Sequence, residues 1–318
     1  MTARAFTGLR VVLVAAFNRR YHRSGLALAA ALEGLGCEVR RCEERRRGWN
    51  ALLGRSLATR LAACLRAGPV DVVLVFKGAS LALADVAELR RRCGGHWVNW
   101  FPDDPHQLEL STRLAPAYDR FFTHDSSSLA RHRAAGARAH YLAFGCDPDY
   151  LRPLPPEARW TTPLVFVGSR DAVREPTLGA LADFGLVAWG PGWPRGPLYG
   201  KDFVKALSGA TLGVNVHQQF GEGGDPARYG TGANMRVFEL ACVGTAQLSD
   251  GKSDIARHLR PDREIVLYTS AAELRDRARA LLADETLRRD LAARARERAV
   301  REHTWRHRME ELLSVALR

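Results

Sequence analysis

Residues 234–250 combine the side chains and the spacing of a ligand site: a polar, charged start, a short apolar helix, a glycine and then a strand. The loop before this segment is rich in glycine, which lets backbone amides approach a ligand closely. These glycines are Gly221, Gly223, Gly224, Gly230 and Gly232. The start of the helix, near Asn234, would offer unpaired N–H groups and a positive dipole end to a phosphate. We therefore predict a phosphate-binding turn at Asn234, with Arg236 beside it.

Glu239 lies about one turn into the same predicted helix. A carboxylate there could accept hydrogen bonds from vicinal hydroxyls such as those of a ribose. The alternative is an ordinary solvated helix residue. The neighbours Phe238, Leu240, Ala241 and Cys242 are apolar, however, and a carboxylate on such a helix needs a partner. This context favours a ligand-binding role for Glu239.

Length and composition indicate a globular protein of two domains. The chain has 318 residues, which is long for a single core, and 46% of them are hydrophobic. No apolar run approaches the roughly 18 residues that span a bilayer, so we expect no transmembrane segment. Residues 11–17 are apolar and follow Arg4 and Arg10, but a polar Asn-Arg-Arg comes directly after them. We therefore interpret residues 9–17 as a first strand rather than a signal peptide.

The six cysteines are scattered and contain no CxxC pair. They are Cys37, Cys42, Cys64, Cys93, Cys146 and Cys242. This pattern predicts reduced thiols in a cytoplasmic protein, not disulfides or a zinc site. His303 and His307 could share a helix face, but no third ligand lies nearby, so we expect no metal site.

The formal net charge is +12, and only four of the 47 basic residues are lysines. Arginines are spread from Arg4 to Arg318, which is typical of compositional bias. The densest cluster, residues 40–47, is interpreted as a solvated surface loop. The alternative is contact with an anionic partner, such as an acidic polymer, nucleic acid or a membrane surface.

Strand and helix patterns alternate along the chain. Strands are expected at residues 9–17, 70–76, 97–101, 120–123 and 140–143, and again at 164–167, 186–189, 212–216, 245–248 and 265–268. Helical stretches such as 25–35 and 81–93 separate them, and helices from residue 271 finish the chain. Continuous apolar strands separated by helices predict parallel sheets covered on both faces. The proline-rich stretch 146–156 reads as a linker.

This order predicts an α/β protein of two doubly wound, Rossmann-like domains that face each other across a cleft. We expect a first domain at 1–152, a second at 153–295 and a closing helix at 296–318 that packs back toward the first domain. Several known motifs are absent or incomplete: G-x-G-x-x-G, the P-loop, G-x-S-x-G and H-E-x-x-H.

The whole chain, and its second half most specifically, resembles a GT-B glycosyltransferase of the CgeB-like group, which is related to the retaining family 4 transferases. Residues 165–170, Val-Phe-Val-Gly-Ser-Arg, are similar to the family's first strand and its phosphate turn, which implies donor contacts from Gly168, Ser169 and Arg170. Arg174 stands near the family's accompanying basic residue. Residues 234–244 resemble the CgeB-like signature, and Glu239 matches the glutamate that holds the donor ribose.

One position departs from this pattern. Family 4 enzymes carry another glutamate eight positions before the ribose-binding one, and here that place is Thr231, followed by Gly232 in the same donor loop. Retention of the anomeric configuration is therefore left open. Asp103, Asp104 and Asn234 are candidates for hydroxyl recognition instead.

In the first half, residues 98–106 stand where related enzymes have a strand that ends at the reacting sugar. Asp103, Asp104 and His106 would orient or deprotonate an acceptor hydroxyl there, although Asp-Asp-Pro is also an ordinary turn sequence.

The resemblance implies a metal-independent transfer from a nucleoside-diphosphate sugar, most simply a UDP-sugar, with no tightly bound cofactor. The acceptor class stays open among protein, polysaccharide, small metabolite, lipid and modified nucleic-acid base. The alternative function is a non-catalytic protein of the same fold that binds nucleotide, sugar or an anionic polymer.

Overall fold

The computed structural model describes residues 6–17, 23–45, 54, 56–218 and 229–318. The chain forms two compact units. One consists of Met1–Ala143 with Trp305–Arg318, and the other of Phe144–Thr304. The functional boundaries predicted at 152/153 and 295/296 stay a proposal. The predicted glycines Gly221, Gly223 and Gly224, and Arg46 and Arg47 of the arginine cluster, lie outside the described residues.

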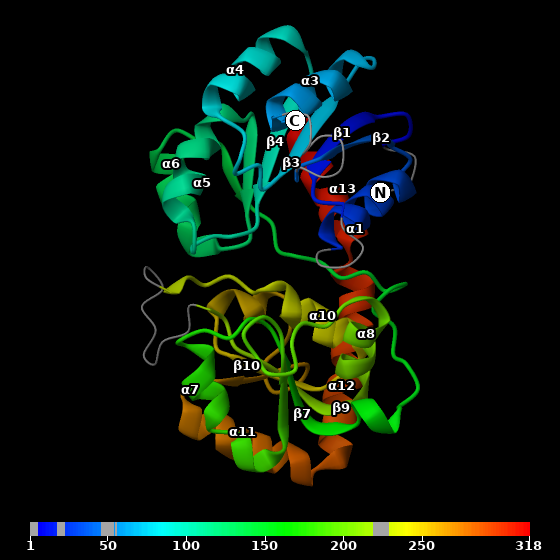
Figure 1. The fold of residues 1–318 in the computed structure, drawn as a ribbon, viewed down its shortest axis with the longest axis vertical. Helices are drawn as coiled ribbons and strands as arrows, with labels where there is room; N and C mark the ends of the chain where they lie inside the picture. Colours follow the sequence, from blue (N-terminus) through cyan, green and yellow to red (C-terminus); the bar gives the residue numbers. More distant parts are fainter. Residues whose placement is uncertain (1–5, 18–22, 46–53, 55, 219–228) are drawn as a thin grey trace. The chain divides into compact units, whose positions relative to one another are not determined.

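The first unit is built on a six-stranded parallel sheet in the order β2-β1-β3-β4-β5-β6 (Figure 1). Its strands are β1 (Arg10–Ala15), β2 (Glu38–Glu43), β3 (Val72–Phe76), β4 (His96–Phe101), β5 (Arg120–Thr123) and β6 (Ala139–Tyr141). Its α-helices are α1 (Ser24–Gly34), α3 (Leu57–Arg66), α4 (Leu83–Arg92), α5 (Leu108–Leu114), α6 (Leu129–Ala134) and α13 (Trp305–Ala316). Leucines of α3 and α4 pack on valines of β1 and β3, while α13 packs against α1.

The second unit has a five-stranded parallel sheet in the order β11-β10-β9-β7-β8. Its strands are β7 (Thr162–Val167), β8 (Leu186–Trp189), β9 (Ala210–Asn215), β10 (Gln247–Asp250) and β11 (Val266–Tyr268). Its α-helices are α7 (Arg174–Gly179), α8 (Gly200–Gly209), α10 (Met235–Val243), α11 (Ala271–Ala283) and α12 (Glu285–Glu302). The chain leaves β7 toward β8 on one side and returns to β9 on the other, so the direction of the strand order reverses between β7 and β9.

The predicted α/β fold class is confirmed, and all ten predicted strands are present. One strand was not predicted. β2 lies at residues where the sequence indicated a surface loop, and this expectation is wrong for the part of the cluster up to Glu43. Within the described ranges β2 is an edge strand that pairs with β1 alone, so its outer side tolerates charged side chains. Arg40, for example, donates to the carbonyls of Cys64 (2.7 Å) and Gly68 (3.0 Å).

Close packing of α8 against the start of β7 depends on a glycine. A Cβ at Gly209, the last residue of α8, would lie 2.6 Å from the carbonyl oxygen of Trp160. At Gly179, the last residue of α7, an added Cβ would meet nothing within 4 Å. The two positions therefore form a matched pair for testing how tightly the helices pack.

We expect Gly209→Ala to lower the free energy of unfolding by about 1–3 kcal/mol, because backbone must move to admit the methyl group. Gly179→Ala should be neutral or stabilise by up to about 1 kcal/mol, since alanine favours helix. Urea denaturation followed by far-UV circular dichroism measures both. Equal effects of the two substitutions would contradict the tight contact at Gly209.

Candidate functional site

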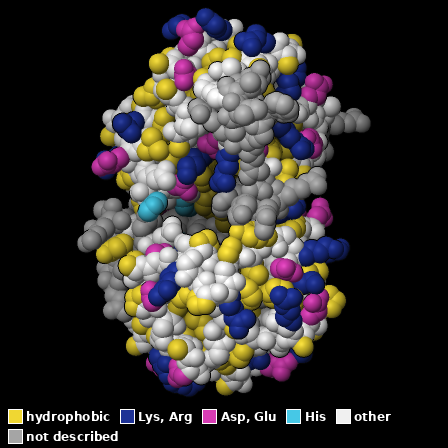
Figure 2. Space-filling model, in the orientation of Figure 1, with side chains coloured by type: hydrophobic (Ala, Val, Ile, Leu, Met, Phe, Trp, Pro, Cys, Tyr) yellow, Lys and Arg dark blue, Asp and Glu magenta, His cyan; other side chains and the backbone are white. Residues whose placement is uncertain are grey.

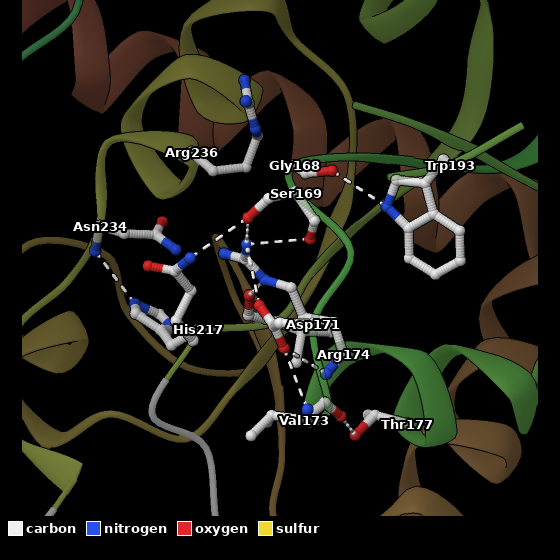
Figure 3. A network of polar contacts seen from close by, with 12 residues as sticks. Gly168, Ser169, Asp171, Val173, Arg174, Thr177, Trp193, His217, Asn234 and Arg236 are labelled. Atoms are coloured by element: carbon white, nitrogen blue, oxygen red, sulfur yellow. Dashed lines mark hydrogen bonds and ion pairs between the residues drawn. The ribbon is translucent and has the colours of Figure 1, made fainter. Parts of the chain in front are cut away.

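A polar network lies at the carboxyl ends of β7 and β9, where the strand order of the second unit reverses (Figure 3). Gly168 and Ser169 directly follow β7, while His217 and Gln218 come shortly after β9. In open parallel sheets, ligands bind at this reversal point, outside the carboxyl ends of the strands. The network is therefore in the place where this fold class binds its ligands.

The turn after β7 is held against the end of β8. The Gly168 N–H donates to the Trp189 carbonyl (2.8 Å), and Trp193 Nε1 donates to the Gly168 carbonyl (3.0 Å). Gly190 has φ 139°, and a Cβ there would lie 1.9 Å from the Gly168 oxygen. Only glycine fits at position 190, so the turn has one well-defined path.

Arg174 organises the network around Ser169. Its Nη1 donates to Ser169 Oγ (2.8 Å), and its Nε donates to the Val216 carbonyl (2.9 Å). Gln218 Nε2 donates to the same Ser169 hydroxyl (3.2 Å). The Arg174 side chain is only 11% exposed. Its guanidinium also pairs with the Asp171 carboxylate (3.5 Å), so it is held in a fixed place by both neutral and charged oxygen atoms.

Two arginines concentrate positive charge at this end of the sheet. Burial lowers the pKa of Arg174, and the nearby Arg236 lowers this pKa further, whereas Asp171 and Asp250 act in the opposite direction. An arginine remains protonated at neutral pH. A bound anion would relieve the repulsion between the two guanidinium groups.

Arg170, also predicted to contact a donor, has a different environment. Its side chain is 44% exposed, forms an ion pair with Glu175 and lies over the Trp193 ring, 5.8 Å from the centroid. It therefore stands beside the network rather than within it. The contact of Arg170 with a donor stays a prediction.

His217 links the end of β9 to the end of β10 and the start of α10. Its Nδ1 lies 2.6 Å from Asp250 Oδ1, and the backbone N–H of Asn234 lies 3.0 Å from its Nε2. A backbone N–H can only donate, so Nε2 accepts and Nδ1 donates its proton to Asp250. Asp250 is fully buried, and its Oδ2 has no hydrogen-bond partner among the described residues. This histidine–carboxylate pair fixes where α10 begins.

The side chain of Asn234 caps α10. Its Oδ1 accepts from the Val237 N–H (3.3 Å), and its Nδ2 donates to Asn215 Oδ1 (2.9 Å). Asn215 in turn donates to Ser249 Oγ (3.0 Å). The predicted helix start is thus correct in position, and it is tied to both β9 and β10.

Glu239 has a partner inside its own helix. Arg236 Nη1 lies 2.5 Å from Glu239 Oε2, and Arg236 Nε donates to the Val167 carbonyl (3.2 Å). Both side chains are about one-fifth exposed. The ion pair explains how an apolar helix accommodates the carboxylate. Among the described residues, no hydrogen bond reaches the other oxygen, Oε1, which leaves it able to accept from a ligand.

Thr231 and Gly232 lie in the loop before α10 and are buried. Thr231 Oγ1 donates to Asp254 Oδ2 (2.9 Å), and the Asp254 N–H donates to the Thr231 carbonyl (3.0 Å). Lys252 Nζ holds the same loop through the Tyr229 carbonyl (2.6 Å). Thr231 therefore has a role in holding the loop.

The predicted acceptor-side residues Asp103, Asp104 and His106 follow β4 in the first unit. Asp103 forms an ion pair with Lys77, which follows β3 and has a left-handed backbone (φ 73°). Both side chains are about one-third exposed. His106 is exposed. Asp103, Lys77 and His106 are thus within reach of solvent at the carboxyl edge of the sheet.

Asp104 lies in a different environment. Its side chain is fully buried, with Oδ1 accepting from Ser111 Oγ (2.5 Å) and Oδ2 2.8 Å from Nε2 of the buried His132. A carboxylate used in this way holds its loop against α5 and α6. This arrangement does not favour the predicted catalytic role of Asp104.

Two further properties concern metals and membranes. Among the described residues, no group of three or more His, Cys, Asp or Glu side chains could hold a metal ion. Within the same part of the chain, no helix has the length and apolar character needed to cross a membrane.

The two parallel sheets, with a polar network at a reversal point of the second, define a doubly wound α/β protein. Residues 172–314 match a family model described as glycosyl transferase-like. This match contains Arg174 and all of α10. A comparison with curated proteins finds no match by sequence.

Solved structures share the fold over nearly the whole chain. Sucrose-phosphate synthase from Thermosynechococcus elongatus has a TM-score of 0.69 at 13% identity, covering 96% of this chain and 98% of that one. HepE from Anabaena, solved with UDP and glucose, has a TM-score of 0.64 at 12% identity, covering 96% and 99%. AviGT4, a glycosyltransferase involved in avilamycin A biosynthesis, has 0.65 at 18% identity, covering 96% of each chain. The chain therefore has the GT-B fold, and its residues 172–314 are similar to the glycosyl transferase-like family.

The sequence analysis did not identify His217 and Asp250 as site residues. Each lies at or just after the carboxyl end of a predicted strand, and this position in the sequence could have indicated a role in the site. Polar residues that follow neighbouring parallel strands meet at one edge of the sheet. Their pairing with each other and with Asn234 is visible only in three dimensions.

We expect His217→Ala to lower the free energy of unfolding by about 3 kcal/mol. The substitution leaves the Asp250 carboxylate and the Asn234 N–H buried without their partner. Urea denaturation measures the loss, with the exposed His106→Ala as the control, expected to change stability by less than about 0.5 kcal/mol. A His217→Ala protein as stable as the control would show that the pair does not hold α10.

Proposed function

We propose that the chain is a glycosyltransferase that moves a sugar from a nucleoside-diphosphate sugar to a hydroxyl of an acceptor. The observation that carries the proposal is the pair Arg174 and Arg236 at the reversal point of the sheet, beside the start of α10. This arrangement lies in the part of the chain that matches the glycosyl transferase-like model.

The diphosphate is the group that these cations would bind. Transfer of the sugar develops negative charge on the leaving diphosphate, and donors that are already in place stabilise it. Arg174, Arg236 and the N–H groups at the start of α10 are such donors, with Gly168 and Ser169 forming the turn beneath them and Arg170 at the margin. Each donor of this kind contributes on the order of 2–4 kcal/mol to the transition state. In this proposal no metal ion is needed.

Glu239 would bind the ribose through Oε1 while Oε2 keeps its contact with Arg236. UDP is the proposed nucleotide, because HepE was solved with UDP and with UDP-glucose. The CgeB-like grouping remains part of the proposal. Thr231, which stands in place of the family's other glutamate, contacts Asp254, so the proposal assigns it no catalytic role and does not depend on retention.

The acceptor would bind at the carboxyl edge of the first unit's sheet. Asp103 and His106 are the groups proposed to orient or deprotonate its hydroxyl. The anionic-polymer alternative receives less support, because Lys and Arg side chains are interspersed with Asp and Glu on the face drawn in Figure 2.

We expect Glu239→Ala to weaken UDP binding by about tenfold to a hundredfold, the range for a hydrogen bond to a charged group. Arg174→Gln should weaken UDP binding more than UMP binding, since it acts on the diphosphate. Isothermal titration calorimetry measures both, with the exposed Glu285→Ala as the control. Unchanged UDP affinity in Glu239→Ala would refute the ribose assignment, and equal losses of UDP and UMP in Arg174→Gln would refute the diphosphate assignment.

We expect Asp103→Asn and His106→Ala to lower sugar transfer by a factor on the order of 100 while sparing UDP affinity. A thermal-shift screen of nucleotide sugars identifies the donor first, since a ligand at 100 times its Kd stabilises by about 2.7 kcal/mol. His96→Ala, at the opposite end of β4, is the control. Transfer at the wild-type rate in both variants would exclude this loop from the reaction, even with the donor site intact.

A further inference from the structure

Two arginines stand side by side at the amino ends of the last two strands of the first unit. β5 and β6 are parallel, and Phe121 is in register with Ala139. This register places Arg120 next to Arg138, and the Phe121 N–H donates to the Arg138 carbonyl (3.1 Å). Neighbouring strands are about 4.8 Å apart, so the two side chains start close together on the same face. Like charges in this position destabilise a sheet.

The two arginines line an open cavity of about 460 Å³. Its other lining residues are Arg133, Ala137, Ala139 and His140. Among the described residues, none that lines the cavity is acidic. The size is that of a small-molecule site, and the polar lining is entirely basic.

The contacts of these arginines place their side chains but do not neutralise them. Arg133 donates from Nε (3.2 Å) and Nη2 (3.1 Å) to the Ala139 carbonyl, and Arg120 Nη1 donates to the Asp119 carbonyl (2.9 Å). In the described part of the chain, neither these two arginines nor Arg138 forms an ion pair with a carboxylate. The Asp119 carboxylate accepts instead from Arg90 and from the Trp97 N–H.

His140 completes the cavity. Its ring lies 5.4 Å from the Phe122 ring on the neighbouring strand. Burial lowers the pKa of His140, and Arg120 and Arg133 lower it further. The effect of both arginines on one imidazole indicates that their charges converge on this cavity. An anion bound there would attract the charges that now repel one another, those of Arg120, Arg133 and a protonated His140.

We propose that this cavity binds a phosphate group. Guanidinium groups match phosphate oxygens bidentately, and three of them around one space suit a phosphate better than a single carboxylate. Arg120 begins β5, whereas Asp103 follows the end of β4, so the cavity lies at the edge of the sheet opposite the proposed acceptor residues. It is separate from the proposed donor site, and the inference does not depend on glycosyl transfer.

The test uses the full chain and sodium pyrophosphate as the probe, with sodium chloride at matched ionic strength as the reference. Isothermal titration calorimetry is done with saturating UDP, which occupies the proposed donor site. The cavity variant is Arg120→Gln with Arg138→Gln. The control is Arg91→Gln with Arg92→Gln, which removes the same charge from exposed positions of the same unit. An Arg174→Gln protein reports any pyrophosphate bound in the second unit.

We expect the cavity variant to bind pyrophosphate at least tenfold more weakly than the control and the Arg174→Gln protein. In sodium chloride alone, the cavity variant should unfold at the same temperature as the wild type or a higher one, because repulsion between Arg120 and Arg138 is removed. Equal affinities in the cavity variant and the control would overturn the proposal. Pyrophosphate binding that is lost in Arg174→Gln but kept in the cavity variant would also overturn the proposal.

The phosphate could belong to a soluble metabolite or to a lipid headgroup, and sedimentation with vesicles distinguishes these sources. Vesicles of phosphatidylglycerol and phosphatidylcholine mixed equally are compared with phosphatidylcholine alone. Sedimentation of the control but not the cavity variant, competed by pyrophosphate, would assign the phosphate to a headgroup. Pyrophosphate binding in the cavity without such sedimentation would assign it to a soluble molecule.

Discussion

The contact between the Asn234 N–H and His217 fixes the start of α10 against the carboxyl ends of β9 and β10. His217 accepts from this backbone group because its other nitrogen donates to the buried Asp250 carboxylate. One residue thereby ties the ends of β9 and β10 to the start of α10. Arg236 and Glu239 project from the first turns of that helix, so their positions at the sheet edge depend on the same contact. The same contact also sets the direction in which the N-terminal N–H groups of α10 point.

Arginines in both units are held by carbonyl oxygens rather than by carboxylates alone. Arg174 donates to Val216, and Arg236 donates to Val167. Arg133 does the same with Ala139 in the first unit. A carbonyl fixes the direction of a guanidinium but does not cancel its charge, which stays available to a bound anion. Arg174 and Arg236 also pair with Asp171 (3.5 Å) and Glu239 (2.5 Å), which offset part of their charge, whereas Arg133 has no carboxylate partner among the described residues.

Neighbouring aspartates after β4 differ because of burial. Asp104 is enclosed with Ser111 and His132, so its charge stabilises the loop. Asp103, one residue earlier, pairs with Lys77 and keeps contact with solvent. The sequence Asp-Asp-Pro-His does not distinguish these roles, since both aspartates are equally common in turns. Only packing against α5 and α6 separates the carboxylate that supports the loop from the one that can meet a ligand.

The sequence by itself determined the α/β class, ten of the strands and the capped start of α10, because apolar runs, helix caps and glycine act over a few residues. β2 was missed because its sequence, Glu-Val-Arg-Arg-Cys-Glu, is mostly charged and lacks a continuous apolar pattern. The partners of the site residues were decided by the tertiary structure alone. His217 meets Asp250 from 33 residues away, and Thr231 meets Asp254 from 23. Such pairs depend on strand order and burial, which have no local signature in the chain.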